Sequence, residues 1–370
     1  MITVCVTKTW SSIFGEQAIR EITKPSTALC NLDIYTLFLL SEPKFVGCSR
    51  LAEILEQVSH DSVNRFLLRE RYSPQDLFNA VKPYISGPGG VISVDDTVVE
   101  KPYSDPIKAE LIGYFWSGKY HKAIKGISLI TLYYNTMQGN SLPINYRIYD
   151  KQEGKTKNEY FREMVEEVIA WGLNPWLVTG DSWYSGVENL KFLKHQKLGF
   201  LLGIEKPRTV SNHPQDYRQV KSLEIPEEGL VTHLKEFGFV KLFRKVFKKE
   251  DSRHYILYLP EPETLKQAPR AEFQKLHDIH WGIENFHRAI KQVCGIGRFM
   301  VRDSEAIKNH IFCALQAFVK LELMRTEKLI SNWYEVQRNL FKNVVREYIL
   351  AHLTSEDPAL NAYSSLSVNA

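Results

Sequence analysis

Apolar and polar residues alternate through the middle of the chain in a pattern that predicts a sheet with helices. Runs of β-branched and aromatic residues predict five strands, over residues 91–99, 123–135, 142–149, 176–179 and 199–204. Apolar residues at helical spacing predict helices over residues 158–171 and 187–195. Strands separated by such helices indicate an α/β fold with a central sheet.

The first 86 residues predict a helical segment instead. Residues 51–57 and 61–69 have helical spacing, and Ser59 in the turn between them is suited to cap the second helix. A helix–turn–helix of this kind would present polar side chains to base edges and phosphates. An ordinary helical hairpin with a charged exterior is the alternative. The polar residues expected on the second helix are Ser62, Asn64, Arg65 and Arg69.

Changes of pattern divide the chain into parts. The run SGPGG at residues 86–90 breaks both periodicities and predicts a boundary. Apolar residues near the C-terminus keep helical spacing, so that segment is expected to cover the core, with dimerisation as the alternative, and residues 364–370 are expected to be disordered. The expected parts are a helical DNA-binding domain (1–86), an α/β core in two pieces (87–206 and 263–310), a β-rich insertion (207–262) and a C-terminal helical segment (311–370).

The composition is that of a folded and mildly basic protein. The 370 residues are 44% hydrophobic and 12% aromatic, which allows two or three domains with sizeable cores. The net charge of +4 permits contact with nucleic acid without requiring it. We see five cysteines without a CxxC pair, no signal-peptide pattern and no apolar run of membrane-spanning length, and we therefore expect a cytoplasmic, nucleoid-associated protein.

Basic and aromatic residues interleave in the expected insertion, where residues 237–249 read FGFVKLFRKVFKK. This mixture is suited to the DNA backbone and to base stacking. An edge strand protected by its lysines is the alternative. The basic residues that we expect to contact DNA are Lys241, Arg244, Lys245 and Lys248.

Carboxylates occur where two of the predicted strands end. Asp95 and Asp96 lie late in the strand over residues 91–99, and Asp181 follows the strand over residues 176–179. A carboxylate at the end of a buried strand is costly unless it is paired or binds a cation. Two strand-end aspartates and a glutamate from a later helix can hold two Mg²⁺ ions, since oxygen-rich sites suit Mg²⁺ and Mn²⁺.

The segment HDIHWGIENFHRAIK at residues 277–291 predicts a helix that supplies this glutamate, Glu284. An acid flanked by basic residues on a partly buried helix suggests a metal ligand with phosphate-binding groups beside it. A solvated polar face is the alternative, and zinc is a weaker one because no HExxH or CxxC spacing is present. The residues that helical spacing places near one face are His277, His280, Glu284, His287 or Arg288, and Lys291.

Together these motifs resemble the DDE transposases of bacterial insertion sequences. DDTVVEKPY at residues 95–103 and GDSWYSGVENLKFLK at residues 180–194 look like the two aspartate motifs. Glu284 and Lys291 fit the E-x6-K part of the branch marked Y-x2-R-x3-E-x6-K. This chain has His277 and His280 where the branch has the Tyr and the Arg that contact DNA phosphate, and histidine is mostly neutral at pH 7.

The resemblance implies an RNase H-like core with a β-rich insertion and helical segments on either side. It implies that Asp96, Asp181 and Glu284 hold two Mg²⁺ ions, which Mn²⁺ may replace. Asp95 would then support the site or be structural, because neighbouring residues on a strand face opposite sides. In relatives a tryptophan of the insertion can hold a flipped base. No tryptophan lies in this insertion, so that role would pass to Phe243, Phe247 or Trp183.

The activity implied by the resemblance is cut-and-paste DNA transposition. The partners would be double-stranded DNA, as terminal inverted repeats and target, bound by a homodimer. Cleavage would free a 3′-hydroxyl that forms a hairpin before strand transfer. A nuclease or resolvase without strand transfer and a catalytically silent DNA-binding protein are the alternatives. The residues expected to hold phosphate near the scissile bond are His277, His280, Arg288 and Lys291.

Overall fold

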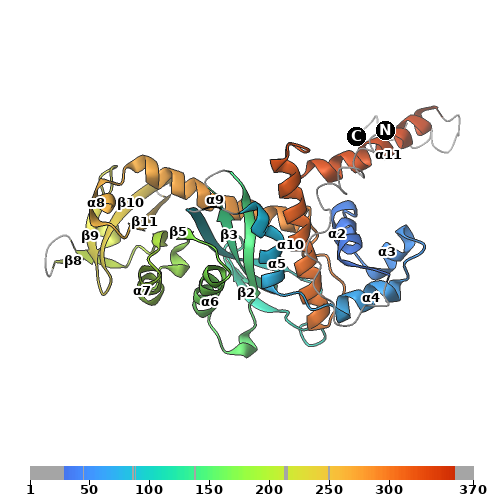
Figure 1. The fold of residues 1–370 in the computed structure, drawn as a ribbon, viewed down its shortest axis with the longest axis horizontal. Helices are drawn as coiled ribbons and strands as arrows, with labels where there is room; N and C mark the ends of the chain where they lie inside the picture. The colour runs from blue at the N-terminus through green and yellow to red at the C-terminus, as the bar shows by residue number, and fades with distance from the viewer. Residues whose placement is uncertain are drawn as a thin grey trace, which may run out of the picture.

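The computed structural model describes residues 29–354, apart from residues 45, 86, 88, 137–138, 212–215 and 249–250. A single mixed sheet runs through the molecule, with helices packed on both of its faces (Figure 1). The strands are β1 (Gly90–Glu100), β2 (Gly113–Ser117), β3 (Lys122–Asn135), β4 (Ser141–Ile148), β5 (Pro175–Gly180), β6 (Gly199–Ile204), β7 (Thr209–Ser211), β8 (Tyr217–Gln219), β9 (Leu230–Leu234), β10 (Gly238–Lys248) and β11 (Asp251–Tyr258). The α-helices are α2 (Leu32–Ser41), α3 (Cys48–Ile54), α4 (His60–Arg69), α5 (Pro74–Val81), α6 (Lys157–Ala170), α7 (Val187–His195), α8 (Pro262–Gln267), α9 (Arg270–Gln292), α10 (Ser304–Thr326) and α11 (Glu335–Thr354).

The strand order confirms the expected α/β fold class and its RNase H-like core. Strand β1 pairs in parallel with β5, which pairs in parallel with β6, and β3 lies antiparallel on the other side of β1. The first part of β3 pairs with β2 and the later part with β4. Our sequence analysis did not predict β2. The order β4-β3-β1-β5-β6 places the two aspartate-bearing strands next to each other at the centre of the sheet.

The expected insertion continues the core sheet. Strand β11 pairs antiparallel with β6, and β10 lies between β11 and β9. Strand β9 pairs only with Gly238–Leu242, so the later half of β10, which carries Arg244 and Lys245, is paired on the β11 side alone. The alternative of a lysine-protected edge therefore stays open for that half. Helix α9 returns the chain from this region to the face of β1 (Figure 1).

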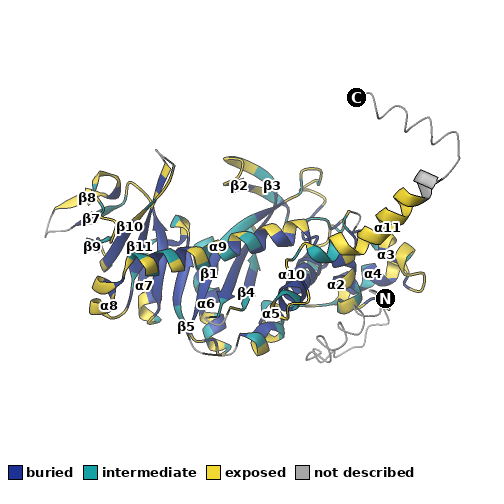
Figure 2. Cartoon of the chain, turned by 90° about the horizontal axis from the view of Figure 1, so that it is seen from above, coloured by how far each residue is buried: buried dark blue, intermediate teal, exposed yellow. Residues whose placement is uncertain are grey.

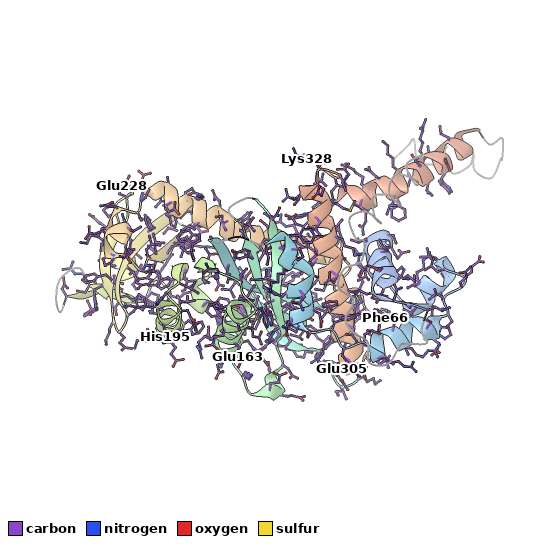
Figure 3. All side chains as sticks on the ribbon, in the orientation of Figure 1. Phe66, Glu163, His195, Glu228, Glu305 and Lys328 are labelled. Atoms are coloured by element: carbon purple, nitrogen blue, oxygen red, sulfur yellow. The ribbon has the colours of Figure 1, made fainter. Side chains whose placement is uncertain are left out.

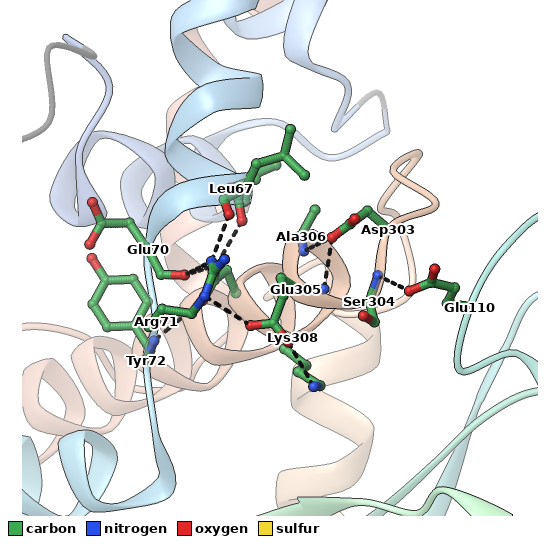
Figure 4. Close-up of polar contacts among 12 residues, drawn as sticks. Leu67, Glu70, Arg71, Tyr72, Glu110, Asp303, Ser304, Glu305, Ala306 and Lys308 are labelled. Atoms are coloured by element: carbon green, nitrogen blue, oxygen red, sulfur yellow. Dashed lines mark hydrogen bonds and ion pairs between the residues drawn. The ribbon is translucent and has the colours of Figure 1, made fainter. Parts of the chain in front are cut away.

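Helix α10 joins the N-terminal helices to the core. It begins before the expected boundary at 310/311 and is buried over most of its length. The hydroxyl of Tyr35 lies 2.8 Å from His310 Nδ1, and the side chain of Asn309 donates to the carbonyls of Leu67 and Glu70, each at 2.7 Å. Figure 4 shows Leu67 and Glu70 beside Glu305 and Lys308 at the start of α10. Apolar residues of the N-terminal helices and of the core therefore form one continuous cluster, and Figure 3 shows Phe66 of α4 in the region beside α10.

The two predicted helices are present as α3 and α4, although α3 begins and ends three residues earlier than expected, and Ser59 accepts a hydrogen bond from the Ser62 backbone at 3.1 Å. Two such helices fit a helix–turn–helix and an ordinary hairpin equally well. Ser62 was expected on the polar face. It is instead buried, and its hydroxyl accepts from the Cys30 backbone at 3.0 Å. Arg65 lies 3.1 Å from Asp61, one turn earlier on the same helix, and Arg69 is exposed.

The C-terminal segment divides into two different helices. Helix α10 covers the core, as expected, whereas α11 extends away from it with exposed side chains (Figure 2). Among the described residues, no helix is both long enough and apolar enough to span a membrane. The residues expected to be disordered, 364–370, lie outside the described part.

Candidate active site

The parallel pairing of β1 and β5 brings two strand-end carboxylates together. Val94 on β1 pairs with Gly180 on β5, so Asp95 and Asp181 follow directly from paired positions. Because the carboxyl ends of parallel strands meet at one edge of a sheet, this edge gathers polar side chains from both strands. Glu284 comes to the same region on α9, which packs across β1 and β5.

Asp181 is held at the start of the short 3-10 helix η3 (Ser182–Tyr184), where its Oδ1 accepts from the Trp183 backbone at 2.9 Å. The turn lies directly against β6. A β-carbon added at Gly203 would lie 2.7 Å from the Ser182 nitrogen. Glycine at this position therefore allows the backbone of the Asp181 turn to pack closely on the neighbouring strand.

The two adjacent aspartates of β1 face opposite sides of the sheet. Asp95 faces α9, where its Oδ2 lies 3.3 Å from His287 Nδ1, and its side chain is only 13% exposed. Asp96 faces α6, where its Oδ2 accepts from Lys157 Nζ at 2.6 Å. The aspartate on the same side of the sheet as Glu284 is therefore Asp95, whereas the family resemblance selected Asp96.

The carboxylates influence one another electrostatically. Burial, reinforced by the negative charge of Asp96, raises the pKa of Asp95 to about 7. Asp181 is open to solvent on one side, but the protein crowding around it and the charges of Asp95 and Asp96 raise its pKa to about 7 as well. The pKa of Glu284 is raised by the surrounding protein and then by Asp95. Carboxylates that disfavour one another's ionisation are stabilised by a proton or by a bound cation.

This donor set fits a divalent cation in its chemistry. Carboxylate oxygens from β1, the β5 end and α9 are hard ligands of the kind that Mg²⁺ and Mn²⁺ prefer. In the described part of the chain, no three acidic, histidine or cysteine side chains are gathered closely enough to form a metal-binding group.

His280 and His287 contact the sheet from the side of α9 that also carries Glu284 and Lys291, as helical spacing predicted. The expectation that His280 lies open to phosphate is not met. His287 Nε2 lies 2.7 Å from the Thr131 hydroxyl, and His280 Nδ1 lies 3.3 Å from the Thr179 hydroxyl. Burial lowers the pKa of both histidines to about 4, so both rings are neutral at pH 7.

His277 is a packing residue and not an exposed phosphate contact. Its ring lies between the Tyr255 hydroxyl, at 3.2 Å, and Lys245 Nζ, at 3.0 Å. Burial and the charge of Lys245 lower its pKa, so the ring carries no positive charge for a phosphate at pH 7. Both ring nitrogens already have partners within the protein.

Of the residues of α9 that we expected to hold phosphate, Arg288 and Lys291 are open to solvent. Lys291 Nζ donates to the Thr97 hydroxyl at 2.6 Å. Thr97 lies two residues after Asp95 on β1, and therefore on the same face of the sheet. Glu284, Arg288 and Lys291 thus form the solvent-facing stripe of the helix.

The basic side chains of β10 point to different sides of the strand and differ in burial. Lys241 is buried, and its Nζ donates to the carbonyls of Lys266 at 3.0 Å and Ala268 at 2.8 Å, so the expectation that it contacts DNA is wrong. Lys245 lies on the same side of the strand and reaches His277. Arg244 points the other way and is exposed. The side chain of Lys248 lies outside the described part.

Large aromatic side chains flank two of the carboxylates. Trp183 follows Asp181 by two residues and Trp281 precedes Glu284 by three, and both are exposed. Tyr184 is fully buried. Of the residues that could hold a flipped base, Phe243 is buried, whereas Phe247 and Trp183 are open to solvent.

Comparison with known proteins adds a family and two distant structures. The family model described as "Transposase DDE domain" matches residues 86–318. A piggyBac transposase synaptic complex with hairpin DNA is 13% identical, over 97% of this chain and 80% of that chain, with a TM-score of 0.49. The Drosophila P element transposase strand transfer complex is 14% identical, over 58% of this chain and 46% of that chain, with a TM-score of 0.25. A search among curated proteins finds no match.

Proposed function

This chain belongs to the transposase DDE domain family, and we propose that it cleaves DNA at the ends of a mobile element and joins those ends to target DNA. The family match contains both aspartate-bearing strands and the helix of Glu284. Helices α2–α5 of this chain precede the matched residues, and we propose that they recognise the element ends.

The observation that carries the proposal is geometric: parallel β1 and β5 end together at Val94 and Gly180, so Asp95 and Asp181 follow at one edge of the sheet, and α9 with Glu284 packs across both strands. We propose these three residues as the ligands of two Mg²⁺ ions, which Mn²⁺ may replace. Bound there, the ions would stabilise the attacking and leaving oxygens of an in-line phosphoryl transfer. Asp95 takes the place of Asp96 in this proposal, because Asp95 raises the pKa of Glu284 and Asp96 is already paired with Lys157.

Neighbouring side chains would orient the substrate and the ligands. His287 would fix the Asp95 carboxylate, since its ring lies between that carboxylate and the Thr131 hydroxyl. Arg288 and Lys291 extend along the solvent-facing stripe from Glu284 and would hold DNA phosphates near the scissile bond.

In the proposed reaction, water attacks the phosphodiester at the element end, and the bond to the 3′-oxygen breaks to leave a 3′-hydroxyl. That hydroxyl then attacks the opposite strand, which forms a hairpin on the DNA end and releases the flanking strand. Hydrolysis reopens the hairpin before the 3′-hydroxyl attacks target DNA. We propose that a homodimer brings the two element ends together.

End recognition is proposed for α4. Asn64, Arg65 and Arg69 lie on this helix, which has its apolar side packed on α10. A helix docked on a core by one side leaves the other for the DNA groove. Arg65 would exchange its partner Asp61 for a base edge or a phosphate on binding.

The test is an incubation of the full-length chain with Mg²⁺, a duplex that carries the inverted repeat flanking its own gene, and a target plasmid. Nicked ends, hairpin ends and joined plasmid products are expected. Cleavage without joined product would identify a nuclease or resolvase instead. Specific binding without cleavage would identify a catalytically silent DNA-binding protein.

A further inference from the structure

The hairpin formed by β2 and β3 carries exposed aromatic and basic side chains that the mechanism above does not use. It extends from the sheet beyond the neighbouring strands (Figure 2). Tyr114 is 59% exposed, Trp116 is 65% exposed, and Tyr120 at the turn is 41% exposed. Side chains with only a packing role would be buried. Three aromatic rings exposed together on a projecting hairpin therefore indicate a binding surface.

The strand register places Tyr114 and Trp116 on the face of the sheet that carries Asp95. Thr97 on β1 pairs with Leu129 on β3, and β3 continues without a break to Lys125, which pairs with Tyr114. Residues that are paired across antiparallel strands face the same side, and so do residues two apart on one strand. The intervening residue Phe115 faces the other side, where it packs on Tyr149.

The turn of the hairpin contacts the end of β1. Lys119 Nζ lies 3.9 Å from Glu100 Oε1 at the end of β1, and the Tyr120 hydroxyl lies 3.4 Å from the other Glu100 oxygen. The charges of Glu100 and Lys119 both act on the pKa of Lys291, which places the turn near that lysine. The hairpin turn therefore lies at the end of β1, within electrostatic reach of Lys291 on α9.

The charge of the hairpin is suited to nucleic acid. Lys119, Lys122 and Lys125 interleave with the three aromatic rings, and Lys119 Nζ lies 4.4 Å from the centre of the Tyr120 ring. Alternating aromatic and cationic side chains bind single strands, because bases stack on the rings while the cations neutralise phosphates. A fully paired duplex hides its base faces and would use only the lysines.

We propose that Tyr114, Trp116 and Tyr120 form a stacking surface for unpaired bases of a DNA strand that leaves the carboxylate edge, with Lys119 and Lys125 holding its phosphates. The inference rests on the proposed function, since cleavage and joining at a DNA end expose such a strand. It adds a second DNA contact, distinct from α4 and from the solvent-facing stripe of α9.

The test measures binding without metal, so it does not depend on cleavage. Full-length protein with Asp95→Asn is titrated in chelator with three fluorescent probes: a short single strand, a duplex with an unpaired 3′ extension, and a blunt duplex. Trp116→Ala is expected to weaken binding to the first two by about tenfold and to leave the blunt duplex unchanged. Trp116→Phe is expected to retain most of the affinity.

Two further measurements separate stacking from charge. A 2-aminopurine in the extension should be quenched on binding, and Trp116→Ala should remove that quenching. Lys119→Ala should reduce the slope of log affinity against log salt by about 0.7 for the single strand. Phe239→Ala, which removes an exposed ring far away on β10, is the matched control and should change neither.

Equal losses on all three probes would overturn the stacking proposal, because they would indicate a general phosphate contact. Unchanged binding combined with a change of oligomeric state in light scattering would also overturn it, and would assign the hairpin to a contact between protein chains. Failure of the proposed catalytic function would appear separately, as absent cleavage by the wild-type chain with Mg²⁺.

Discussion

His287 Nδ1 lies 3.3 Å from Asp95 Oδ2, and Nε2 of the same ring lies 2.7 Å from the Thr131 hydroxyl. Burial lowers the pKa of this ring to about 4, so it is neutral at pH 7. A neutral imidazole that donates from Nδ1 to the carboxylate can accept from the threonine at Nε2. His287 thus connects α9 to β1 and orients the aspartate that we propose as a metal ligand.

Replacement of His287 tests this positioning role. His287→Ala should lower the single-turnover cleavage rate by about tenfold to a hundredfold, as loss of a residue that orients a metal ligand does. Affinity for the DNA end should stay unchanged, because the ring is buried. His195→Ala, which changes an exposed histidine on α7, is the control. A wild-type cleavage rate for His287→Ala would show that Asp95 does not need this partner.

The close packing at Gly203 gives a second prediction. Gly203→Val should displace the Asp181 turn, because an added β-carbon would lie 2.7 Å from the Ser182 nitrogen. Cleavage should fall strongly while end binding persists. Gly186→Val, at the N-cap of α7 after the Asp181 turn, is the matched control, because an added β-carbon there meets nothing within 4 Å. Equal activity of the two variants would show that the turn can move without affecting the site.

Lys241 and Arg244 should behave differently although both lie on β10. Lys241→Met should lower the free energy of unfolding by about 1–3 kcal/mol, since two buried carbonyls lose their donor. It should leave DNA affinity unchanged at temperatures where the protein is folded. Arg244→Ala should leave stability unchanged and reduce the salt slope of duplex binding by about 1. Thermal unfolding and salt titration distinguish the two, and a reversed pattern would refute the assignment.

The buried His310 predicts a loss of stability in acid. Its pKa is lowered by burial from 6.5 to about 4, so the unfolded chain binds a proton more readily than the folded one between these values. The stabilisation is therefore complete above about pH 6.5 and is lost as pH falls toward 4, by about 3 kcal/mol in total. His310→Gln should be less stable than wild type at pH 7.

The difference in unfolding free energy between wild type and His310→Gln reports on His310 alone, because all other titrating residues are the same in both proteins. Urea unfolding midpoints of wild type and His310→Gln should converge as pH falls from 7 to about 4. Parallel curves over that range would show that His310 does not titrate with unfolding.

Local patterns predicted the strands and helices of the core, because hydrophobic periodicity reports which residues face an interior. The strand with Asp95 and Asp96 and the helix with Glu284 were both expected. Strand β2 was missed, since it is short and its exposed residues Tyr114 and Trp116 give no polar alternation.

Side-chain directions could not be predicted, because they depend on how distant elements pack. Alternation required Asp95 and Asp96 to face opposite sides, but the choice between them depended on which face of β1 receives α9. In the same way, the sequence predicts Lys241 as a surface cation, but in the structure the segment after α8 covers it. The sequence predicts His277 as a phosphate contact, but in the structure its ring packs against Tyr255.

The most direct test of the catalytic assignment compares Asp95→Asn with Asp96→Asn. Each full-length variant is bound to its terminal-repeat duplex, and single-turnover cleavage is started with Mg²⁺. We predict that Asp95→Asn binds the end normally and gives no detectable cleavage, whereas Asp96→Asn retains measurable cleavage because its carboxylate pairs with Lys157 on the other side of β1. Near wild-type cleavage by Asp95→Asn, with none by Asp96→Asn, would contradict the account.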